Sequence, residues 1–337
     1  MLLISSSRFA EHDTPPGHPE RPERAEVFAA VARAWRDRVS AVTEPRRATR
    51  EELLRVHSAE HVRRISETSG RAAMLDADTF TSPDSYEVAL LAAGAAVQAL
   101  EHALDAKEAA FALVRPPGHH AERDRPMGFC LFNNVAVAAA AALARGVSRV
   151  AVVDIDVHHG NGTQWMFYED PRVLYVSTHQ YPFYPGTGAA DEIGRGAGEG
   201  YTVNLPLEAG ATDADYAVAY LAIANVIEQY APELLLISAG FDAHEDDPLA
   251  SMRVTTAGYA AVIQILKGAA IRARCPIALA TEGGYDLDAL HGCLDATLTV
   301  LSEDAPVAIT ADAKGAPRAE RALDGVRVVQ KRFWTTI

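Results

Sequence analysis

The chain has 337 residues, of which 49% are hydrophobic and 23% are charged, so it is long enough to bury a sizeable core. This composition excludes a disordered, a collagen-like and a disulfide-rich protein. The 45 acidic side chains outnumber the 31 basic ones and give a formal charge of −14, which repels a phosphate backbone, so we expect no direct nucleic-acid partner.

Two further features bear on the compartment of the protein. Residues Met1 to Arg8 contain no basic stretch ahead of a long apolar one, so we expect no secretory signal; no charge-free apolar run of about 18 residues predicts a membrane span. Cys130, Cys275 and Cys293 form no CxxC pair, which indicates neither a disulfide framework nor a thiolate zinc site. We therefore predict a cytoplasmic protein.

In chain order, the sequence first predicts two amphipathic helices, Glu20–Arg38 and Ser85–Leu104, the first of which follows a loop rich in Pro, Gly and His at Thr14–Pro19. Short apolar runs then alternate with alanine-rich helical stretches. Buried strands that alternate with helices are typical of a parallel sheet covered on both faces, so the predicted class is α/β. The predicted strands are Ala110–Val114, Val150–Ile155, Val173–Ser177, Tyr201–Leu205, Leu234–Ser238 and Ile277–Ala280, and the predicted helices are Asn133–Arg145, Asp213–Tyr230, Thr256–Arg272 and Leu287–Leu301.

The sequence predicts one domain. We find no internal repeat and no low-complexity linker, and the glycine-rich stretch Gly194–Gly200 is too short to separate domains. The mixed-charge segment Arg318–Trp334 predicts a surface helix near the C-terminus.

Polar clusters begin where the predicted strands end. Arg115-Pro-Pro-Gly-His-His-Ala-Glu122 follows one strand and Asp154-Ile-Asp-Val-His-His-Gly-Asn-Gly162 the next. Ser238-Ala-Gly-Phe-Asp242 and Glu282-Gly-Gly-Tyr285 follow two later strands. Because ligands bind outside the carboxyl ends of the strands in an open parallel sheet, we expect these clusters to meet in one cleft.

Asp156 and His158 are the strongest candidates for a metal site. Side chains two residues apart in an extended segment point to the same face, and Asp154 precedes them on that face. A carboxylate and an imidazole suit Zn²⁺, and equally Fe²⁺, Co²⁺ or Mn²⁺. Asp242 is the best third ligand, because a carboxylate after the buried run Leu234–Ser238 is costly unless it is paired or metal-bound. Three protein ligands leave a position open for water and substrate, as in catalytic sites.

Each of these residues also has a structural interpretation. Asp156 and His158 are alternatively polar residues at a strand end whose side chains are hydrogen-bonded by loop amides. Asp242 is alternatively the N-cap of a helix. His244 stands two residues after Asp242, a spacing at which its imidazole could be taken for a second metal ligand from this segment. We favour a loop role for it, because the neighbouring pair Asp246-Asp247 is typical of a solvated acidic turn.

Two more groups are candidates for catalysis. Adjacent imidazoles, as at His119 and His120, supply a general base and a partner that stays charged or donates a hydrogen bond; a solvated turn is the alternative. Tyr285 follows two glycines that let its phenol reach over the cleft toward an oxyanion; an ordinary surface tyrosine is the alternative. We interpret the histidines of helices and outlying loops as structural or solvated: His12, His18, His57, His61, His102 and His291.

Five motifs occur in order along the chain: Arg115-Pro-Pro-Gly-His-His, Gly128-Phe-Cys-Leu-Phe-Asn-Asn134, Asp154-Ile-Asp-Val-His-His-Gly-Asn-Gly-Thr-Gln164, Ser238-Ala-Gly-Phe-Asp242 with Asp247-Pro248, and Glu282-Gly-Gly-Tyr285. Together they resemble the zinc-dependent histone deacetylase family, and the class II and bacterial deacetylase-like branch fits best. The resemblance runs from about His18-Pro-Glu-Arg-Pro-Glu-Arg24 to beyond Tyr285. It implies the arginase/deacetylase fold, one domain with an eight-stranded parallel sheet, a catalytic core at about 18–305 and a C-terminal surface extension at 306–337.

The resemblance also implies roles for individual residues. It matches the Zn²⁺ ligands to Asp156, His158 and Asp242, the general base to His120, its electrostatic partner and later acid to His119, and the oxyanion donor to Tyr285. Asp154 would orient His119. Asn161 stands near His120, where class I enzymes carry an aspartate.

A monovalent cation, K⁺ or Na⁺, and an acyl-lysine tunnel follow from the same resemblance. The residues implied for the cation are Asp154, Asp156, His158, Ser177 and Thr178, with a second ion near Phe167. The tunnel walls would be Phe129 and Tyr184, next to Gly128. Leu249 occupies a position at which eukaryotic polyamine deacetylases carry a glutamate, so it favours acyl-lysine. His244 stands where arginases need a second acidic ligand, which disfavours a binuclear manganese site.

The expected activity is zinc-dependent hydrolysis of the linear amide bond in N-acyl-lysine side chains of a protein or peptide, with release of acetate and free amine. The first alternative is a hydrolase of acetylpolyamines or other small acylated amines. The second is a non-catalytic acyl-lysine binding module, against which the presence of His119, His120 and Tyr285 argues. A homo-oligomer is compatible with the sequence.

Overall fold

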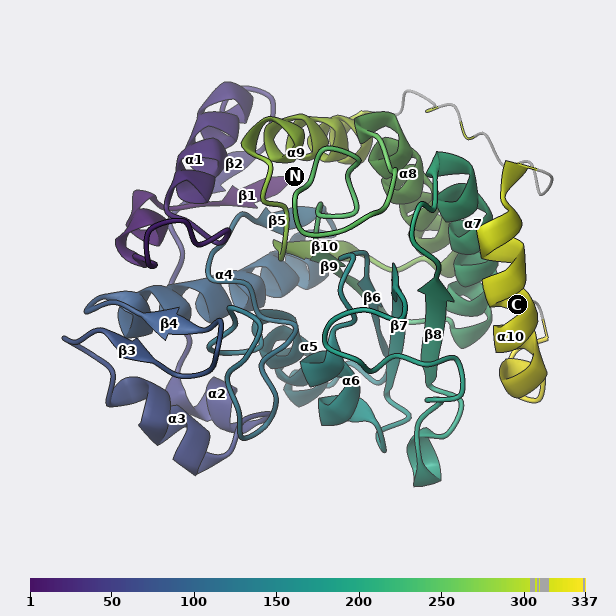
Figure 1. The fold of residues 1–337 in the computed structure, drawn as a ribbon, viewed down its shortest axis with the longest axis horizontal. Coiled ribbons are helices and arrows are strands. Elements are labelled where there is room, and N and C mark those ends of the chain that lie inside the picture. Colours follow the sequence, from purple (N-terminus) through teal and green to yellow (C-terminus); the bar gives the residue numbers. More distant parts are fainter. Residues whose placement is uncertain (304–306, 308, 310–314, 336) are drawn as a thin grey trace.

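A computed structural model describes residues 1–303, 307, 309, 315–335 and 337. Its centre is an eight-stranded sheet in the order β2-β1-β5-β10-β9-β6-β7-β8, in which all neighbouring strands run parallel (Figure 1). This sheet confirms the predicted α/β class. Its strands are β1 (Leu2–Ile4), β2 (Ala41–Thr43), β5 (Ala110–Ala112), β6 (Val150–Asp154), β7 (Val173–Gln180), β8 (Thr202–Leu207), β9 (Leu234–Ala239) and β10 (Ile277–Thr281).

The sequence patterns did not predict β1 and β2, the two strands at one end of this sheet. β1 pairs with both β2 and β5, and each of these strands has only three residues. A run of three residues is too short for its periodicity to distinguish a strand from a loop. A separate two-stranded hairpin, β3 (Ala73–Met74) with β4 (Phe80–Thr81), was missed for the same reason.

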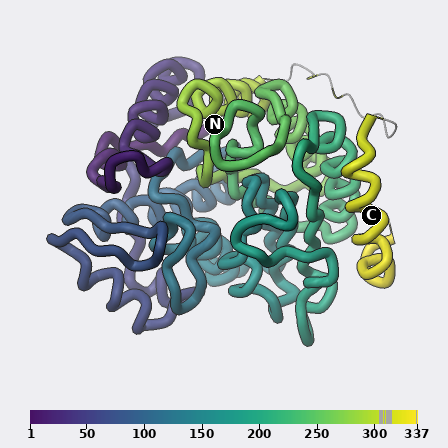
Figure 2. The backbone as a smooth tube through the Cα atoms, in the orientation of Figure 1, coloured from purple at the N-terminus to yellow at the C-terminus, as the bar shows by residue number. Residues whose placement is uncertain are grey.

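Helices cover both faces of the sheet, and alternate strand residues face opposite cores. Along β6, Val150 and Val152 pack with α4 and α5, whereas Ala151 and Val153 pack in the core that contains α7 and α8. Figure 2 shows the course of the backbone in the orientation of Figure 1. The helices are α1 (Glu23–Trp35), α2 (Arg50–Leu54), α3 (Ala59–Ser66), α4 (Ser85–Ala106), α5 (Asn134–Ala144), α6 (Asn161–Phe167), α7 (Asp213–Tyr230), α8 (Thr256–Ala273), α9 (Leu287–Ser302) and α10 (Pro317–Gln330).

The long apolar helix α4 runs through the interior. Within the described part of the chain it is the one helix long and apolar enough to cross a membrane, and 72% of its apolar window is buried in the fold. It contacts β5, β10 and α5. A mostly buried helix of this kind is typical of a protein core.

The C-terminal helix α10 packs on α7 and on the edge strand β8 (Figure 1). Ala319, Leu323 and Val326 are buried there, and the Gln330 side-chain amide donates to the Thr202 carbonyl on β8 at 2.6 Å. Parts of the predicted surface extension, residues 306, 308, 310–314 and 336, lie outside the described residues. The described part of this extension, α10, packs one face against the domain and covers the edge strand β8, which no further strand pairs with in the described sheet.

Two helical glycines give a matched test of packing. A Cβ added to Gly94 in α4 would lie 2.0 Å from the Arg46 carbonyl oxygen and 2.6 Å from the Ala48 nitrogen. We therefore expect Gly94→Ala to lower the free energy of unfolding by about 1–3 kcal/mol in urea titrations. Gly325→Ala in α10, where the added atom meets nothing within 4 Å, should raise it by up to about 1 kcal/mol. Equal effects of the two substitutions would contradict this packing.

Candidate active site

The structure brings the four polar clusters together at one edge of the sheet. The loops that carry them follow β5, β6, β9 and β10, which are consecutive in the sheet in the order β5-β10-β9-β6. Asp154 lies directly beside Ser238 on one side and beside Ser177 of β7 on the other. Residues from well-separated chain segments therefore face a common site.

Asp156, His158 and Asp242 form a buried cluster. One candidate ligand atom from each of them lies within 4.8 Å of the others. His158 Nδ1 lies 3.2 Å from Oδ1 of Asp156 and 3.1 Å from Oδ2 of Asp242, and both carboxylates are 0% exposed. The helix N-cap interpretation of Asp242 is wrong, because the next helix, α8, begins at Thr256.

The charges of this cluster fit a cation. Burial, followed by the charge of Asp156, raises the pKa of Asp242 to about 7. Burial opposes the charged form of His158, but hydrogen bonds to Asp156 and Asp242 outweigh it and raise the pKa of His158 to about 10. The two carboxylates therefore favour a positive charge between them. Two carboxylates and one imidazole form a donor set that Zn²⁺ and other divalent transition ions accept.

Three glycines leave room for the buried carboxylates. A Cβ added to Gly160, Gly240 or Gly283 would lie 2.1 Å from Oδ2 of Asp154, Asp156 or Asp242, respectively. The Gly283 nitrogen also donates to Oδ2 of Asp156 at 2.8 Å. Any larger residue at these positions would displace a carboxylate of the site.

His119 and His120 lie beside the cluster in opposite electrostatic surroundings. His119 Nδ1 donates to Oδ2 of Asp154 at 3.0 Å. Burial opposes its charge, but Asp154 and Asp156 outweigh burial and raise the pKa of His119 well above its usual range. Burial, and then the charge of His119, lowers the pKa of His120 well below its usual range. Both rings are buried, so the solvated-turn interpretation is wrong, and their surroundings favour the charged form of His119 and the neutral form of His120.

Tyr285 is held by its backbone and its neighbours. Its nitrogen donates to Oδ2 of Asp247 at 2.6 Å, and Arg24 Nε donates to the Gly284 carbonyl at 2.8 Å. The Arg24 guanidinium carbon lies 5.0 Å from the centre of the Tyr285 ring. Tyr285 is 7% exposed, so it is not an ordinary surface tyrosine. Asp247 is also buried and accepts from the Leu249 nitrogen, so its assignment to a solvated turn is wrong.

A buried ion-pair network lies behind this loop. Glu20 accepts one hydrogen bond from Arg24 at 3.0 Å and two from Arg115 at 2.7 and 2.8 Å. Burial favours the neutral form of Glu20, but Arg115 and His12 outweigh it and hold the pKa of Glu20 well below its usual range. Arg24 thus connects this network to the Tyr285 loop.

Glu282 is a further buried carboxylate whose role the sequence analysis missed. Its Oε2 accepts from the backbone nitrogens of Gly118 at 2.6 Å and His119 at 3.1 Å, and its Oε1 accepts from the Ser238 hydroxyl at 3.0 Å. Burial raises its pKa to about 7. Its position between a buried strand and two glycines was the available signal. Glu282 ties the histidine loop to the neighbouring strands.

Aromatic side chains surround the approach to the cluster. The Phe129 ring centre lies 5.8 Å from that of Tyr285, and the Tyr184 ring centre lies 5.2 Å from that of His120. A Cβ added to Gly128 would lie 2.3 Å from Cδ2 of His120, so Gly128 packs directly on that ring.

Two side chains near this approach were missed or misplaced by the sequence analysis. Phe183 stacks on the His158 ring at 5.5 Å. His18, expected in an outlying loop, has its ring centre 4.7 Å from that of Phe129. His18 and Leu249 line a hollow of about 780 Å³ beside Tyr285.

The residues implied for monovalent cations fall into two places. Ser177 and Thr178 are buried beside Asp154, and their hydroxyls are hydrogen-bonded to the His179 ring and the Tyr220 hydroxyl, respectively. Phe167 ends α6 and lines a different surface hollow. An ion beside Ser177 would thus depend on backbone carbonyl groups, and both cation sites stay predictions.

Comparison with known protein families settles the family. Residues 18–301 match the histone deacetylase domain. The chain belongs to the histone deacetylase family. This histone deacetylase family member is 39% identical over 293 residues to a probable deacetylase of Archaeoglobus fulgidus, with 85% of this chain and 81% of that protein covered.

Other relatives agree with this assignment. Histone deacetylase 15 of Arabidopsis thaliana is 40% identical over 335 residues; the match covers 95% of this chain but 59% of the plant protein. The crystal structure of the HDA15 HD domain matches with a TM-score of 0.91 and 36% identity, covering 100% of this chain and 97% of that chain. The protein is a hydrolase of the deacetylase type, acting on amide bonds.

His244 and several other histidines have partners outside the cluster of Asp156, His158 and Asp242. His244 contacts the Thr256 hydroxyl at 3.3 Å and accepts from the Asp246 nitrogen. His12, His57 and His61 are buried, His102 lies near Glu108, and His291 is exposed. The loop role of His244 agrees with expectation, and the three buried rings are structural rather than solvated.

His57 gives a test of the acid stability of the deacetylase. Its Nδ1 donates to the Glu122 carbonyl and its Nε2 accepts from the Asn133 nitrogen, and burial lowers its pKa from 6.5 to about 3. Because only the unfolded chain binds this proton between those values, the stability present above pH 6.5 is lost as the pH falls toward 3. We expect His57→Gln to flatten the pH dependence of the unfolding free energy by about 1.4 kcal/mol per pH unit in that window.

Urea unfolding at a series of pH values measures this slope. His291→Gln, on an exposed surface of α9, is the matched control and should leave the slope unchanged. A wild-type slope in the His57→Gln protein would show that His57 binds its proton as readily in the folded state as in the unfolded chain, which would contradict the lowered pKa.

Proposed function

We propose that this deacetylase is a zinc-dependent amidohydrolase that removes acetyl or other acyl groups from N-acyl-lysine side chains. The observation that carries the proposal is the buried Asp156, His158 and Asp242 cluster, in which the His158 ring centre lies 6.0 Å from that of His120. The relatives named histone deacetylases support an acetylated protein as substrate.

The chain supplies a base, an acid and an oxyanion donor for amide hydrolysis. A divalent ion held by Asp156, His158 and Asp242 would supply a Lewis acid for the amide carbonyl and for the attacking water. His120, kept neutral by burial and by His119, takes the proton from that water as its oxygen attacks the carbonyl carbon. The Tyr285 hydroxyl donates to the developing oxyanion.

Cleavage of the carbon–nitrogen bond then needs a proton for the leaving amine. His119, which Asp154 keeps charged, is the acid that we assign to this step. The products are a carboxylate and a free amine. Retention of His119, His120 and Tyr285 together argues against a module that only binds acyl-lysine.

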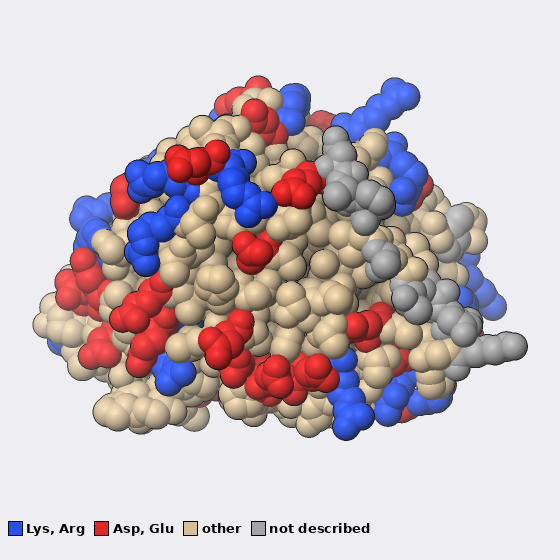
Figure 3. Space-filling model, turned by 90° about the horizontal axis from the view of Figure 1, so that it is seen from above, with Lys and Arg blue, Asp and Glu red and all other residues tan. Residues whose placement is uncertain are grey.

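The tunnel residues support a long aliphatic substrate. The flat faces of Phe129 and Tyr184 would hold a four-carbon stem, and the apolar Leu249 offers no partner to a remote ammonium. The net charge of −14 attracts both acyl-lysine proteins and acylpolyamines, and acidic and basic side chains are interspersed on the face seen in Figure 3. Charge alone does not separate the two substrates, so the acetylpolyamine alternative stays open.

Tyr285→Phe tests the oxyanion donor. We expect kcat on a fluorogenic acetyl-lysine peptide to fall by about 100- to 1,000-fold, while KM stays within about twofold, because the lost hydrogen bond forms only in the transition state. Tyr201→Phe, whose ring packs against Trp334 far along the chain from the site, is the control and should keep full activity. A rise in KM that accounts for the whole loss would contradict the role of Tyr285.

A direct substrate comparison separates the proposal from its main alternative. We expect a higher kcat/KM on acetyl-lysine peptides than on acetylputrescine or acetylspermidine at matched concentrations, because Leu249 provides no carboxylate for a second ammonium. A strong preference for the polyamines would assign the alternative activity to the same residues.

A further inference from the structure

A carboxylate outside the metal cluster contacts the amide that faces His120. Asn161 is the first residue of α6, and its Oδ1 accepts from His120 Nδ1 at 2.8 Å. Its Nδ2 donates to Oε1 of Glu122 at 2.7 Å. Asn161 is 1% exposed and His120 is 4% exposed, so solvent does not compete for the bond between them, whereas the Glu122 side chain is 26% exposed. Glu122, Asn161 and His120 therefore form one hydrogen-bonded chain.

The direction of this chain follows from the chemistry of its first member. A carboxylate only accepts hydrogen bonds, so the amide group that faces Glu122 must be the NH₂. A reversed amide would place its oxygen against the Glu122 oxygen. With the NH₂ toward Glu122, the amide oxygen faces His120 and requires a proton on Nδ1 of that ring. Nε2 of His120 is then the nitrogen with a free lone pair.

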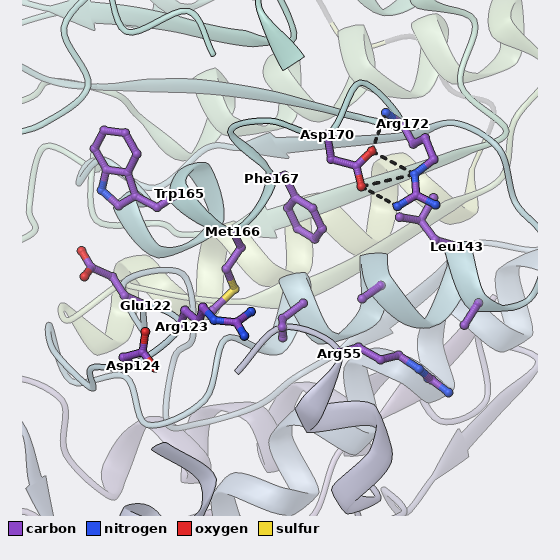
Figure 4. Close-up of a pocket in the computed structure, with 13 residues that line it drawn as sticks. Arg55, Glu122, Arg123, Asp124, Leu143, Trp165, Met166, Phe167, Asp170 and Arg172 are labelled. Atoms are coloured by element: carbon purple, nitrogen blue, oxygen red, sulfur yellow. Dashed lines mark hydrogen bonds and ion pairs between the residues drawn. The ribbon is translucent and has the colours of Figure 1, made fainter. Parts of the chain in front are cut away.

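The backbone of the loop holds Glu122 in this position. Its carbonyl accepts from His57 Nδ1 at 3.0 Å, and its nitrogen donates to the Arg125 carbonyl at 2.9 Å. In Figure 4, Glu122 lies at one end of a surface pocket and Arg172 at the other. Arg125, at 3.2 Å, is the arginine paired with its carboxylate.

We propose that Glu122 is a positioning residue that fixes the amide of Asn161 and, through it, the tautomer of His120. The proposal rests on the assignment of His120 as the general base. When the ring takes up a proton, the amide that Glu122 polarises stabilises the new charge on Nδ1–H. Glu122 thus supplies, through Asn161, the negative charge that an aspartate in direct contact with the base would provide.

Glu122→Gln tests this role with little change of shape. A glutamine side chain donates or accepts, so either orientation of the Asn161 amide becomes possible. We expect kcat to fall on the order of tenfold with KM unchanged. The control is Asp124→Asn, which removes the same charge from an exposed residue of the same loop and pocket and should leave kcat unchanged. Equal kcat values for the two variants would overturn the proposal.

A double substitution distinguishes positioning from a merely structural contact. Asn161→Asp places a carboxylate beside Glu122, and we expect this variant to be impaired by repulsion between the two charges. Adding Glu122→Gln should relieve the repulsion and raise kcat, so the same substitution is harmful with Asn161 and beneficial with N161D. A loss in both backgrounds would overturn the proposal.

A spectroscopic measurement tests the proposal independently of turnover. Nitrogen-15 NMR of the histidine rings in the metal-free protein, assigned with His120→Gln, should show His120 protonated at Nδ1 in the wild type and a mixture of tautomers in Glu122→Gln. An unchanged ring in Glu122→Gln would overturn the role of Glu122. If the wild type hydrolyses neither acyl-lysine nor acylpolyamine substrates, the proposed function fails, and this measurement still decides the positioning role.

Discussion

The rest of the site depends on the burial of four carboxylates at one edge of the sheet. Asp154, Asp156, Asp242 and Glu282 are each 0% exposed. Charge buried in this way is costly unless it is hydrogen-bonded or balanced by an opposite charge. His119 and the Asp156 nitrogen satisfy Asp154, and backbone nitrogens of the histidine loop satisfy Glu282. Asp156 and Asp242 also accept from the nitrogens of Gly283 and Val157, and the two carboxylates share the imidazole of His158, where their charges favour a cation.

The same buried charge shifts the pKa values of the two adjacent histidines in opposite directions. His119 faces Asp154 and Asp156, whereas His120 faces the neutral amide of Asn161 and lies next to the His119 ring. Parallel strands make this possible, because their carboxyl ends bring loops from different segments into contact. Gly160, Gly240 and Gly283 have no side chain, so their loops pack directly against the buried carboxylates.

The sequence predicts the fold class and the cluster Asp156, His158 and Asp242 because their signals are local. Buried runs of four or more residues identify the central strands, and the period of two places Asp156 and His158 on one face. Strands β1 and β2 were missed because three residues carry too little pattern. Local signals therefore cover the centre of the sheet and its metal-ligand candidates.

The residues that hold the site in place were not predictable in this way. Arg24 donates to the Gly284 carbonyl, 260 residues away in the chain. Asp247 accepts from the Tyr285 nitrogen, 38 residues away. The motif containing Glu122 was visible, but its role depends on the amide of Asn161, which only the folded chain places against it. Long-range partners of this kind are set by the tertiary structure rather than by local pattern.

The central claim is that Asp156, His158 and Asp242 together bind one divalent ion. X-ray diffraction from crystals grown with Zn²⁺, recorded above and below the zinc absorption edge, tests it most directly. We expect one anomalous peak, present only above the edge, at about 2 Å from an oxygen of each carboxylate and a ring nitrogen of the histidine. A difference map without a peak between the three side chains, or with its zinc peak elsewhere, would contradict it.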